Sequence, residues 1–211
     1  MFALLIALAA AALLIAAAFQ AALPRIAERR IGARLVYNGG EATVEVRSFP
    51  AVRLLRNHGD RIEVRGRDLE IALTPEGKPS RGLAALDGFE AVDIELVDFR
   101  TGPFAVDAFV LERTGGGSYA MAVRGQTTPS ELAVLGAESL SSFPGGSLIG
   151  SVAGATPLGS RTFSVSLEME LISEPTGLRV GAGGGSIAGY PAGPLATTIA
   201  AAVARRMVIA P

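Results

Sequence analysis

Nineteen residues at the start of the chain, Met1 to Phe19, contain no polar side chain, and the first charged residue is Arg25. As an α-helix with a rise of 1.5 Å per residue, this run would be about 28 Å long, close to the roughly 30 Å hydrocarbon thickness of a bilayer. A helix that is apolar on all sides has no polar face for water, so it does not suit the surface of a soluble domain. The run therefore predicts a hydrophobic helix that directs the chain to a membrane.

Two fates stay open for residues 1–23: removal as a signal peptide, or retention as a membrane anchor that forms a transmembrane helix. The run Ala16 to Ala18 fits a small-residue cleavage site, whereas the basic residues expected before the apolar run are missing. Four arginines follow the run instead, and the positive-inside rule would then leave the rest of the chain in the cytoplasm. We nonetheless expect export, either to the extracytoplasmic face of the cell membrane or into the cell envelope. The four arginines are Arg25, Arg29, Arg30 and Arg34.

Residues 24–211 have the size of a single domain with its own hydrophobic core. The chain has no Cys, so neither a disulfide nor a thiolate nucleophile can form. Its net charge is −1, from 19 basic and 20 acidic residues, and this balance predicts no nucleic-acid partner. The 26 Gly and 12 Pro residues are typical of many short strands joined by turns. The composition leaves the oligomeric state open.

The hydrophobic pattern predicts an α+β fold. We expect a strongly curved antiparallel sheet that is wrapped around, or packed on, two main helices and is preceded by the N-terminal hydrophobic helix. In the strand that begins at Phe89, the apolar positions change parity after Val97, as at a bulge. Alternation predicts strands over 41–49, 61–73, 89–100, 103–113, 118–125, 161–172 and 177–180. Helical spacing and caps predict helices over 24–35, 50–56, 128–140 and 194–206.

Catalytic signatures are nearly absent from the sequence. The only histidine, His58, lies in a predicted turn, and no G-x-S-x-G motif supplies a serine nucleophile. Asp93 and Glu95 alternate with apolar residues, which is typical of the solvent-facing side of a strand and not of a catalytic pair. No cluster of His, Cys or carboxylates has the spacing of a metal site. We therefore expect no enzyme, with no catalytic residue, cofactor or metal.

A glycine-rich segment matches a dinucleotide-binding pattern only superficially. Gly183, Gly185 and Ala188 fit G-x-G-x-x-A, but Pro191 and Pro194 interrupt the helix that such a site requires. No acidic residue follows to bind a ribose. The segment from Gly181 is therefore predicted to be a flexible link.

The apolar face of the predicted sheet admits two interpretations. Hydrophobic residues make up 49% of the chain, and strands of this length can form a sheet with one apolar face. This face either packs on helices or lines a groove for acyl chains. The hydrophobic pattern alone favours packing.

Three segments together resemble the actinobacterial LmeA-like phospholipid-binding proteins: IAERRIG after the apolar run, VEVRSFPAVRLLRNHGDRIEVRG, and YPAGPL. In that family a strand ends in a Phe-Pro turn, here Phe49-Pro50, passes through a Leu-rich turn, here Leu54-Leu55, and returns in a strand, here from Gly59. The resemblance covers most of the chain after Pro24. It implies an exported envelope protein that binds phospholipid, with a fold similar to tubular lipid-binding domains.

This resemblance implies that phospholipid acyl chains lie in an apolar groove, without catalysis. The partners would be phospholipid or another membrane lipid and the membrane itself, and the headgroup would meet Arg side chains or backbone N–H groups at the mouth of the groove. The alternative is a structural or scaffolding envelope protein with no lipid ligand. The candidate lipid-binding residues are Leu54, Leu55, Val92, Ile94, Leu96, Phe163, Val165, Leu167 and Met169.

Overall fold

The computed structural model describes residues 2–71, 82–101, 104–128, 162–174 and 177–191. These residues form one α-helix, two short 3₁₀ helices and nine strands. The helix predicted to end near residue 140, the loop that follows it, and the helix predicted over 194–206 lie outside the described residues. The predicted domain of residues 24–211 is therefore described only in part.

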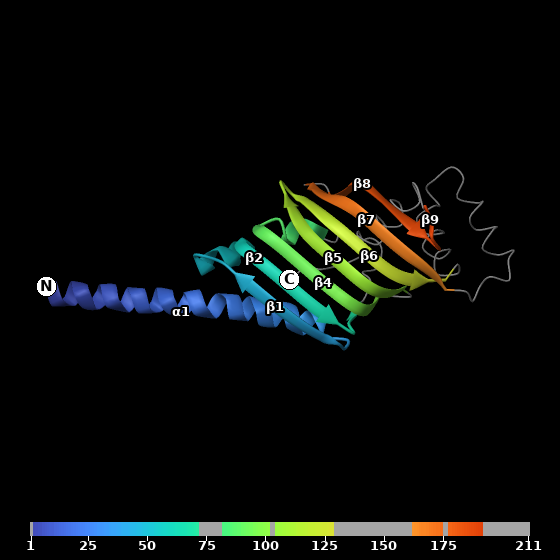
Figure 1. The fold of residues 1–211 in the computed structure, drawn as a ribbon. Coiled ribbons are helices and arrows are strands. Elements are labelled where there is room, and N and C mark those ends of the chain that lie inside the picture. Colours follow the sequence, from blue (N-terminus) through green and yellow to red (C-terminus); the bar gives the residue numbers. More distant parts are fainter. Residues whose placement is uncertain (1, 72–81, 102–103, 129–161, 175–176, 192–211) are drawn as a thin grey trace.

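One mixed sheet dominates the described part of the chain (Figure 1). Its strands pair in the order β1-β2-β4-β5-β6-β7-β8-β9, and β3 pairs with β4 beyond the end of β2. The bounds are β1 Glu41–Arg47, β2 Gly59–Arg67, β3 Glu70–Ile71, β4 Phe89–Thr101, β5 Phe104–Gly115, β6 Ser118–Thr127, β7 Phe163–Glu174, β8 Gly177–Ile187 and β9 Tyr190–Pro191.

The predicted α+β class is wrong both in its share of helix and in the kind of sheet expected. The described residues are mostly strand, with a single α-helix, and the sheet is not strongly curled. It is also not purely antiparallel, because β2 and β3 both run parallel to β4. Backbone hydrogen bonds from Asp68 N to Val97 O and from Arg100 N to Leu69 O continue this pairing past the end of β2. Alternation in the sequence defines the two faces of a strand but not its neighbour, which is why the parallel pairing was missed.

Helix α1 spans Phe2–Leu35 without a break and includes Pro24. It therefore crosses the boundary expected after residue 23. In the described part of the chain, no helix is long and apolar enough to span a membrane. The predicted transmembrane helix is thus wrong. Gln20, ahead of Pro24, makes polar contacts with Ser48 and Ala51 of the folded domain.

The second half of α1 covers the edge strand β1. The Glu28 Oε1 atom accepts a hydrogen bond of 3.0 Å from Val46 N on β1. Gln20 donates from Nε2 to Ser48 O at 2.8 Å and accepts at Oε1 from Ala51 N at 2.7 Å. Glu28 thus satisfies a backbone group that an exposed edge strand would leave free for pairing with another chain, and Gln20 holds the segment that follows β1. The apolar side chains Ala27, Ile31 and Leu35 pack against the core from the same helix.

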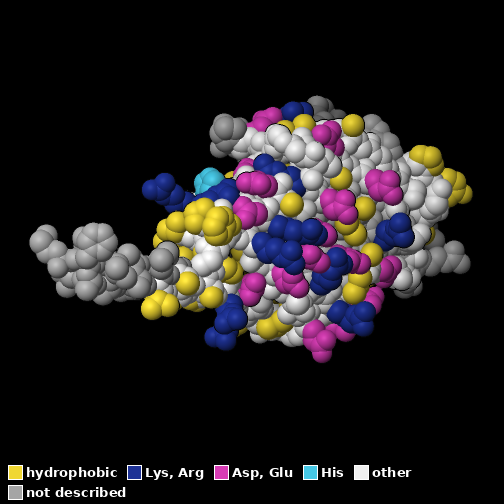
Figure 2. All heavy atoms as spheres, turned by 60° about the vertical axis from the view of Figure 1, so that its left-hand side comes forward, with side chains coloured by type: hydrophobic (Ala, Val, Ile, Leu, Met, Phe, Trp, Pro, Cys, Tyr) yellow, Lys and Arg dark blue, Asp and Glu magenta, His cyan; other side chains and the backbone are white. Residues whose placement is uncertain are grey.

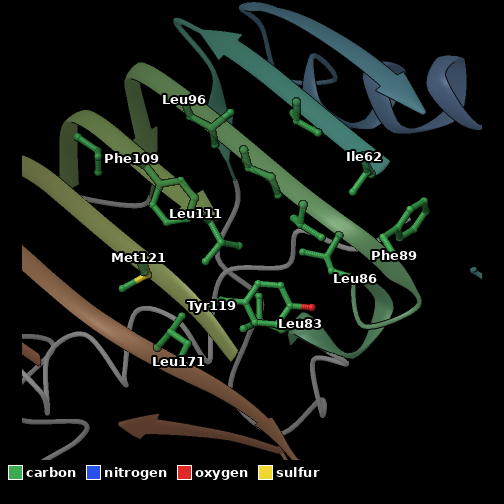
Figure 3. Close-up of a cluster of buried hydrophobic side chains, with 14 of the residues drawn as sticks. Ile62, Leu83, Leu86, Phe89, Leu96, Phe109, Leu111, Tyr119, Met121 and Leu171 are labelled. Atoms are coloured by element: carbon green, nitrogen blue, oxygen red, sulfur yellow. The ribbon is translucent and has the colours of Figure 1, made fainter. Parts of the chain in front are cut away.

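The core lies on one face of the sheet (Figure 3). Inward positions alternate with outward ones along β2, β4, β6 and β7, as the hydrophobic pattern predicted. The predicted change of parity in β4 is confirmed, because Leu96 and Phe99 are both buried and Asp98 has a left-handed φ of 51°. The rings of Phe99 and Phe109 meet edge to face with centroids 6.3 Å apart.

The glycine-rich segment is a strand, so its prediction as a flexible link is wrong. Residues of β8 pair with β7 through Leu167↔Gly185 and Met169↔Gly183. A Cβ atom at Gly183 would lie 2.6 Å from Met169 Cβ, and one at Gly185 would lie 2.7 Å from Leu167 Cδ2. The two glycines are thus required by the backbone and side chains of β7, which leave no room for a larger residue.

Candidate functional site

The apolar face collects most of the predicted lipid-binding residues. Val92, Ile94 and Leu96 on β4 and Leu167 and Met169 on β7 are all buried in one hydrophobic cluster. Val165 on β7 and Leu54 on η1 (Ala51–Arg56) are half-buried and pack against this cluster, and Phe163 at the start of β7 is half-buried. Leu55 is the exception, because 70% of it is exposed and it lies outside the cluster.

Burial decreases along β7 towards its N-terminal end. Leu171 is 2% exposed and Met169 6%, whereas Val165 and Phe163 are only half-buried. Val123 on the neighbouring β6 is half-buried as well and packs against the core. The apolar side chains of Val123, Val165 and Phe163 are therefore more accessible than those of the core, whereas Gly125 and Thr127, which pair with Val165 and Phe163, are buried. We call Val123, Phe163 and Val165 the open end of the apolar face.

A polar cluster lies at the opposite end of β7, beside η2 (Gly82–Ala85). The Tyr119 hydroxyl, on β6, donates a 2.8 Å hydrogen bond to Asp87 Oδ1, and the Ser173 hydroxyl donates to Asp87 Oδ2. Arg113 donates to the Asp87 carbonyl at 2.8 Å and to the Phe89 carbonyl, and its guanidinium lies 5.8 Å from the Tyr119 ring centroid. Tyr119 is fully buried. Through these hydrogen bonds the turn after η2 contacts three neighbouring strands, β5, β6 and β7.

The chemistry of this cluster is that of a structural contact. Burial, first, and then the hydrogen bond to Asp87 raise the pKa of Tyr119 above its ordinary value. The phenol therefore stays protonated and donates its hydrogen bond, which does not prepare it to act as a base or nucleophile. Sequence reasoning missed the cluster. The one available signal was a tyrosine at an inward position of a predicted strand, which needs a partner for its hydroxyl when buried.

Replacing Tyr119 by Phe is expected to lower the free energy of unfolding by about 1 kcal/mol, because Asp87 loses one donor. The loss should depend on pH. Above roughly pH 10 the unfolded phenol ionises while the folded one keeps its proton, so wild-type stability falls as pH rises past this value. Urea unfolding at pH 8 and at higher pH should show the gap between wild type and Tyr119→Phe narrowing. The exposed Tyr190 supplies the control Tyr190→Phe, and an equal change in both variants would contradict the role of the cluster.

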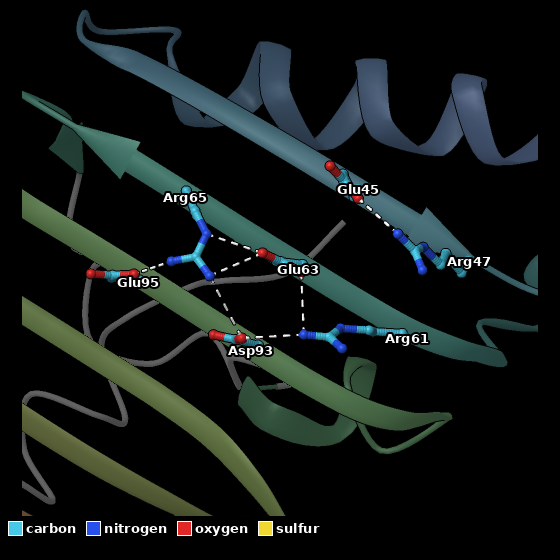
Figure 4. A network of polar contacts seen from close by, with 7 residues as sticks. All are labelled: Glu45, Arg47, Arg61, Glu63, Arg65, Asp93 and Glu95. Carbon is cyan, nitrogen blue, oxygen red and sulfur yellow. Dashed lines mark hydrogen bonds and ion pairs between the residues drawn. The ribbon is translucent and has the colours of Figure 1, made fainter.

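The outer face of the sheet carries a charged network on β2 and β4 (Figure 4). Arg61 lies between Glu63, at 3.2 Å, and Asp93, at 3.4 Å. Arg65 contacts Glu63 at 3.0 Å, Asp93 at 3.8 Å and also Glu95. The hydrogen bond to Glu63 is the largest cause that raises the pKa of Arg65. The prediction that Asp93 and Glu95 form a solvent-facing side is confirmed, and both carboxylates pair with arginines on the neighbouring strand.

Exposed hydrophobic side chains gather where α1 leaves the body of the molecule (Figure 2). Among the described residues, five large hydrophobic side chains are exposed on α1 up to Phe19 or on the segment from Phe49 through η1. Leu55, one of the candidate lipid-binding residues, belongs to this exposed group and not to the buried cluster. We call this group the apolar tip; it consists of Leu14, Phe19, Phe49, Val52 and Leu55.

His58 lies beside the apolar tip in an exposed turn. Its Nδ1 atom is 2.6 Å from the Arg56 carbonyl, to which it donates a hydrogen bond. Within the described ranges, no group of three or more His, Cys, Asp or Glu side chains is arranged to hold a metal ion.

Comparison with protein-family models, with curated proteins and with solved structures gave no match. The resemblance to the LmeA-like family therefore stays a prediction from the sequence. The candidate site is therefore described from this structure alone. It comprises an apolar sheet face with an open end, an outer face that carries paired charges, and an apolar tip.

Proposed function

We propose that this protein binds phospholipid without catalysis, taking an acyl chain against the apolar face of the sheet at its open end. The observation that carries the proposal is the gradient of burial along β7, from Leu171 inside the core to the half-buried Val165 and Phe163. An acyl chain that lies along this end of β7 would cover the half-buried side chains and so continue the hydrophobic core. The resemblance to phospholipid-binding envelope proteins supports the same function, and so does the extracytoplasmic location that it implies.

The energetics of such binding need no charged or catalytic group. Moving one methylene from water to an apolar surface contributes about 0.8 kcal/mol, so burial of about ten methylenes supplies the roughly 8 kcal/mol of micromolar affinity. Most of an acyl chain of ordinary length is enough. The absence of a nucleophile–base pair in the candidate site is compatible with this function, in which no bond is made or broken.

The proposal is tested with a phospholipid that carries a photoreactive group near the end of one acyl chain. The full chain is irradiated with this lipid, and intact mass spectrometry measures the fraction that gains the mass of one lipid. We expect attachment that unlabelled phospholipid competes away. Val165→Trp should lower attachment several-fold by filling the open end, whereas Glu168→Trp, on the opposite face of the same strand, should leave it unchanged. Absence of attachment would favour the alternative, a scaffolding protein with no lipid ligand.

A further inference from the structure

Hydrogen bonds and ion pairs hold the loop that carries three residues of the apolar tip. The loop from Phe49 to η1 is held by Asp60, whose Oδ2 accepts from Phe49 N at 2.7 Å and whose Oδ1 accepts from Arg53 at 2.6 Å. Arg53 also pairs with Glu90 at 3.1 Å, and Gln20 bonds the loop to α1. These contacts use the polar groups of the loop. Its large apolar side chains are left outside, with exposed fractions of 75% for Phe49, 57% for Val52 and 70% for Leu55.

The charge around the apolar tip is basic. No acidic residue occurs before Glu28 or between Phe49 and Gly59. Glu28 is bonded to β1, and the nearest acids, Asp60 and Glu90, are paired with Arg53. Arg56, at the end of η1, is exposed and has no acidic partner among the described residues. Arg25 and Arg29 are exposed on α1 just after the apolar half of the helix. Figure 2 shows basic side chains at the edges of the hydrophobic group, and acidic side chains only on its side towards the body of the molecule.

We propose that the apolar tip docks on the surface of an anionic phospholipid bilayer. Apolar side chains on a protruding surface, with basic residues beside them, match the interfacial region of a membrane: the side chains enter the boundary between headgroups and acyl chains, and the arginines meet anionic headgroups. Two members of the tip, Leu14 and Phe19, belong to a continuous run of nineteen residues that carries no polar side chain. Charge complementarity and this continuity favour a lipid surface over a protein partner. The inference uses other residues than the proposed acyl-chain site and does not rest on it.

A single introduced tryptophan gives a direct test, because the chain contains none. The full-length variant Leu55→Trp is mixed with vesicles of phosphatidylcholine, with and without phosphatidylglycerol. On vesicles that contain phosphatidylglycerol we expect a blue shift of the emission, and quenching by lipids with brominated acyl chains. The matched control is Tyr190→Trp on β9, at the opposite edge of the sheet and 77% exposed in the native residue. Its emission should not shift.

Two further variants separate the apolar from the electrostatic contribution. Leu55→Asp should weaken vesicle binding about tenfold or more, because an aliphatic side chain no longer enters the lipid. Arg56→Glu should weaken binding only to vesicles that contain phosphatidylglycerol. Tyr37→Asp, at an 85% exposed residue outside the tip, controls for the added charge. Circular dichroism confirms folding, which exposed positions should not affect.

Three outcomes would overturn the inference. In the first, the protein sediments with vesicles but the tryptophan of Leu55→Trp keeps the emission it has in water, which would place the lipid contact elsewhere on the protein. A blue shift that appears without vesicles and grows with protein concentration would assign the tip to a second copy of the chain. Failure of the protein to bind any of the vesicles would exclude a lipid bilayer as the partner of the apolar tip. Loss of photoattachment near Val165 with vesicle docking intact would instead remove the proposed acyl-chain binding and leave this inference standing.

Discussion

Replacing Ile94 by Asp is expected to unfold the protein, or to lower its free energy of unfolding by roughly 4 kcal/mol or more. Ile94 has no exposed surface and lies in the middle of β4, between neighbours of the same apolar face on β2 and β5. A carboxylate there would lose its hydration without gaining a partner. Thermal unfolding followed by circular dichroism measures the effect.

Val97→Asp is the matched control, since Val97 lies on the same strand but faces the other side and is only half-buried. Its cost should be about 1 kcal/mol or less, because solvent and nearby arginines can accommodate the charge. Equal stability of the two variants would mean that the two faces of β4 do not differ, and it would contradict the amphipathic sheet on which the proposed acyl-chain site depends.

Replacing Gly183 by Val is expected to cost roughly 2–3 kcal/mol and to loosen β8 from β7. The new side chain would begin 2.6 Å from Met169 Cβ and 2.9 Å from the Glu168 carbonyl, so β8 would have to move. Gly184, the next residue on the same strand, has no atom within 4 Å of a built Cβ. Gly184→Val should therefore be neutral or slightly stabilising, because a β-branched residue suits a strand better than Gly.

Urea unfolding of the two glycine variants gives the comparison. A large loss for Gly183→Val and none for Gly184→Val would confirm the close approach of β7. Similar losses in both variants would show that glycine serves this strand through backbone freedom alone, and the packing of Leu167 and Met169 over β8 would then be incorrect.

Alternation predicted most strands of the fold because one face of the sheet is apolar along its length. The faces of β4 and β7 and the parity change near Asp98 follow directly from the order of side chains. The sheet's connectivity does not follow, since β2 pairs with β4 and not with a hairpin partner. Only the start of β8, residues 177–180, was predicted as a strand. Its glycine-rich continuation was missed because the glycines are explained by neighbours on β7 that are close only after folding.

The candidate site, like the fold, could be predicted only where it depends on the local order of side chains. Inward residues such as Leu96 and Met169 were identified, because a position on an apolar face needs only the local pattern. Leu54 and Leu55 are adjacent, and the pattern could not tell which one packs inward on a short 3₁₀ helix. The contacts of Asp87 with Tyr119 and Ser173 join residues 32 and 86 positions apart, and no local pattern reports such pairs.

The central claim is that an acyl chain lies against the apolar face at its open end, and the position of the photoattached lipid tests it most directly. After proteolysis of the labelled full chain, tandem mass spectrometry identifies the modified residues. The account predicts label on β6 and β7 near Val123, Phe163 and Val165. Label confined to the apolar tip, at Phe49 to Leu55 or on the first half of α1, would contradict it, because lipid would then only touch the outside of the protein.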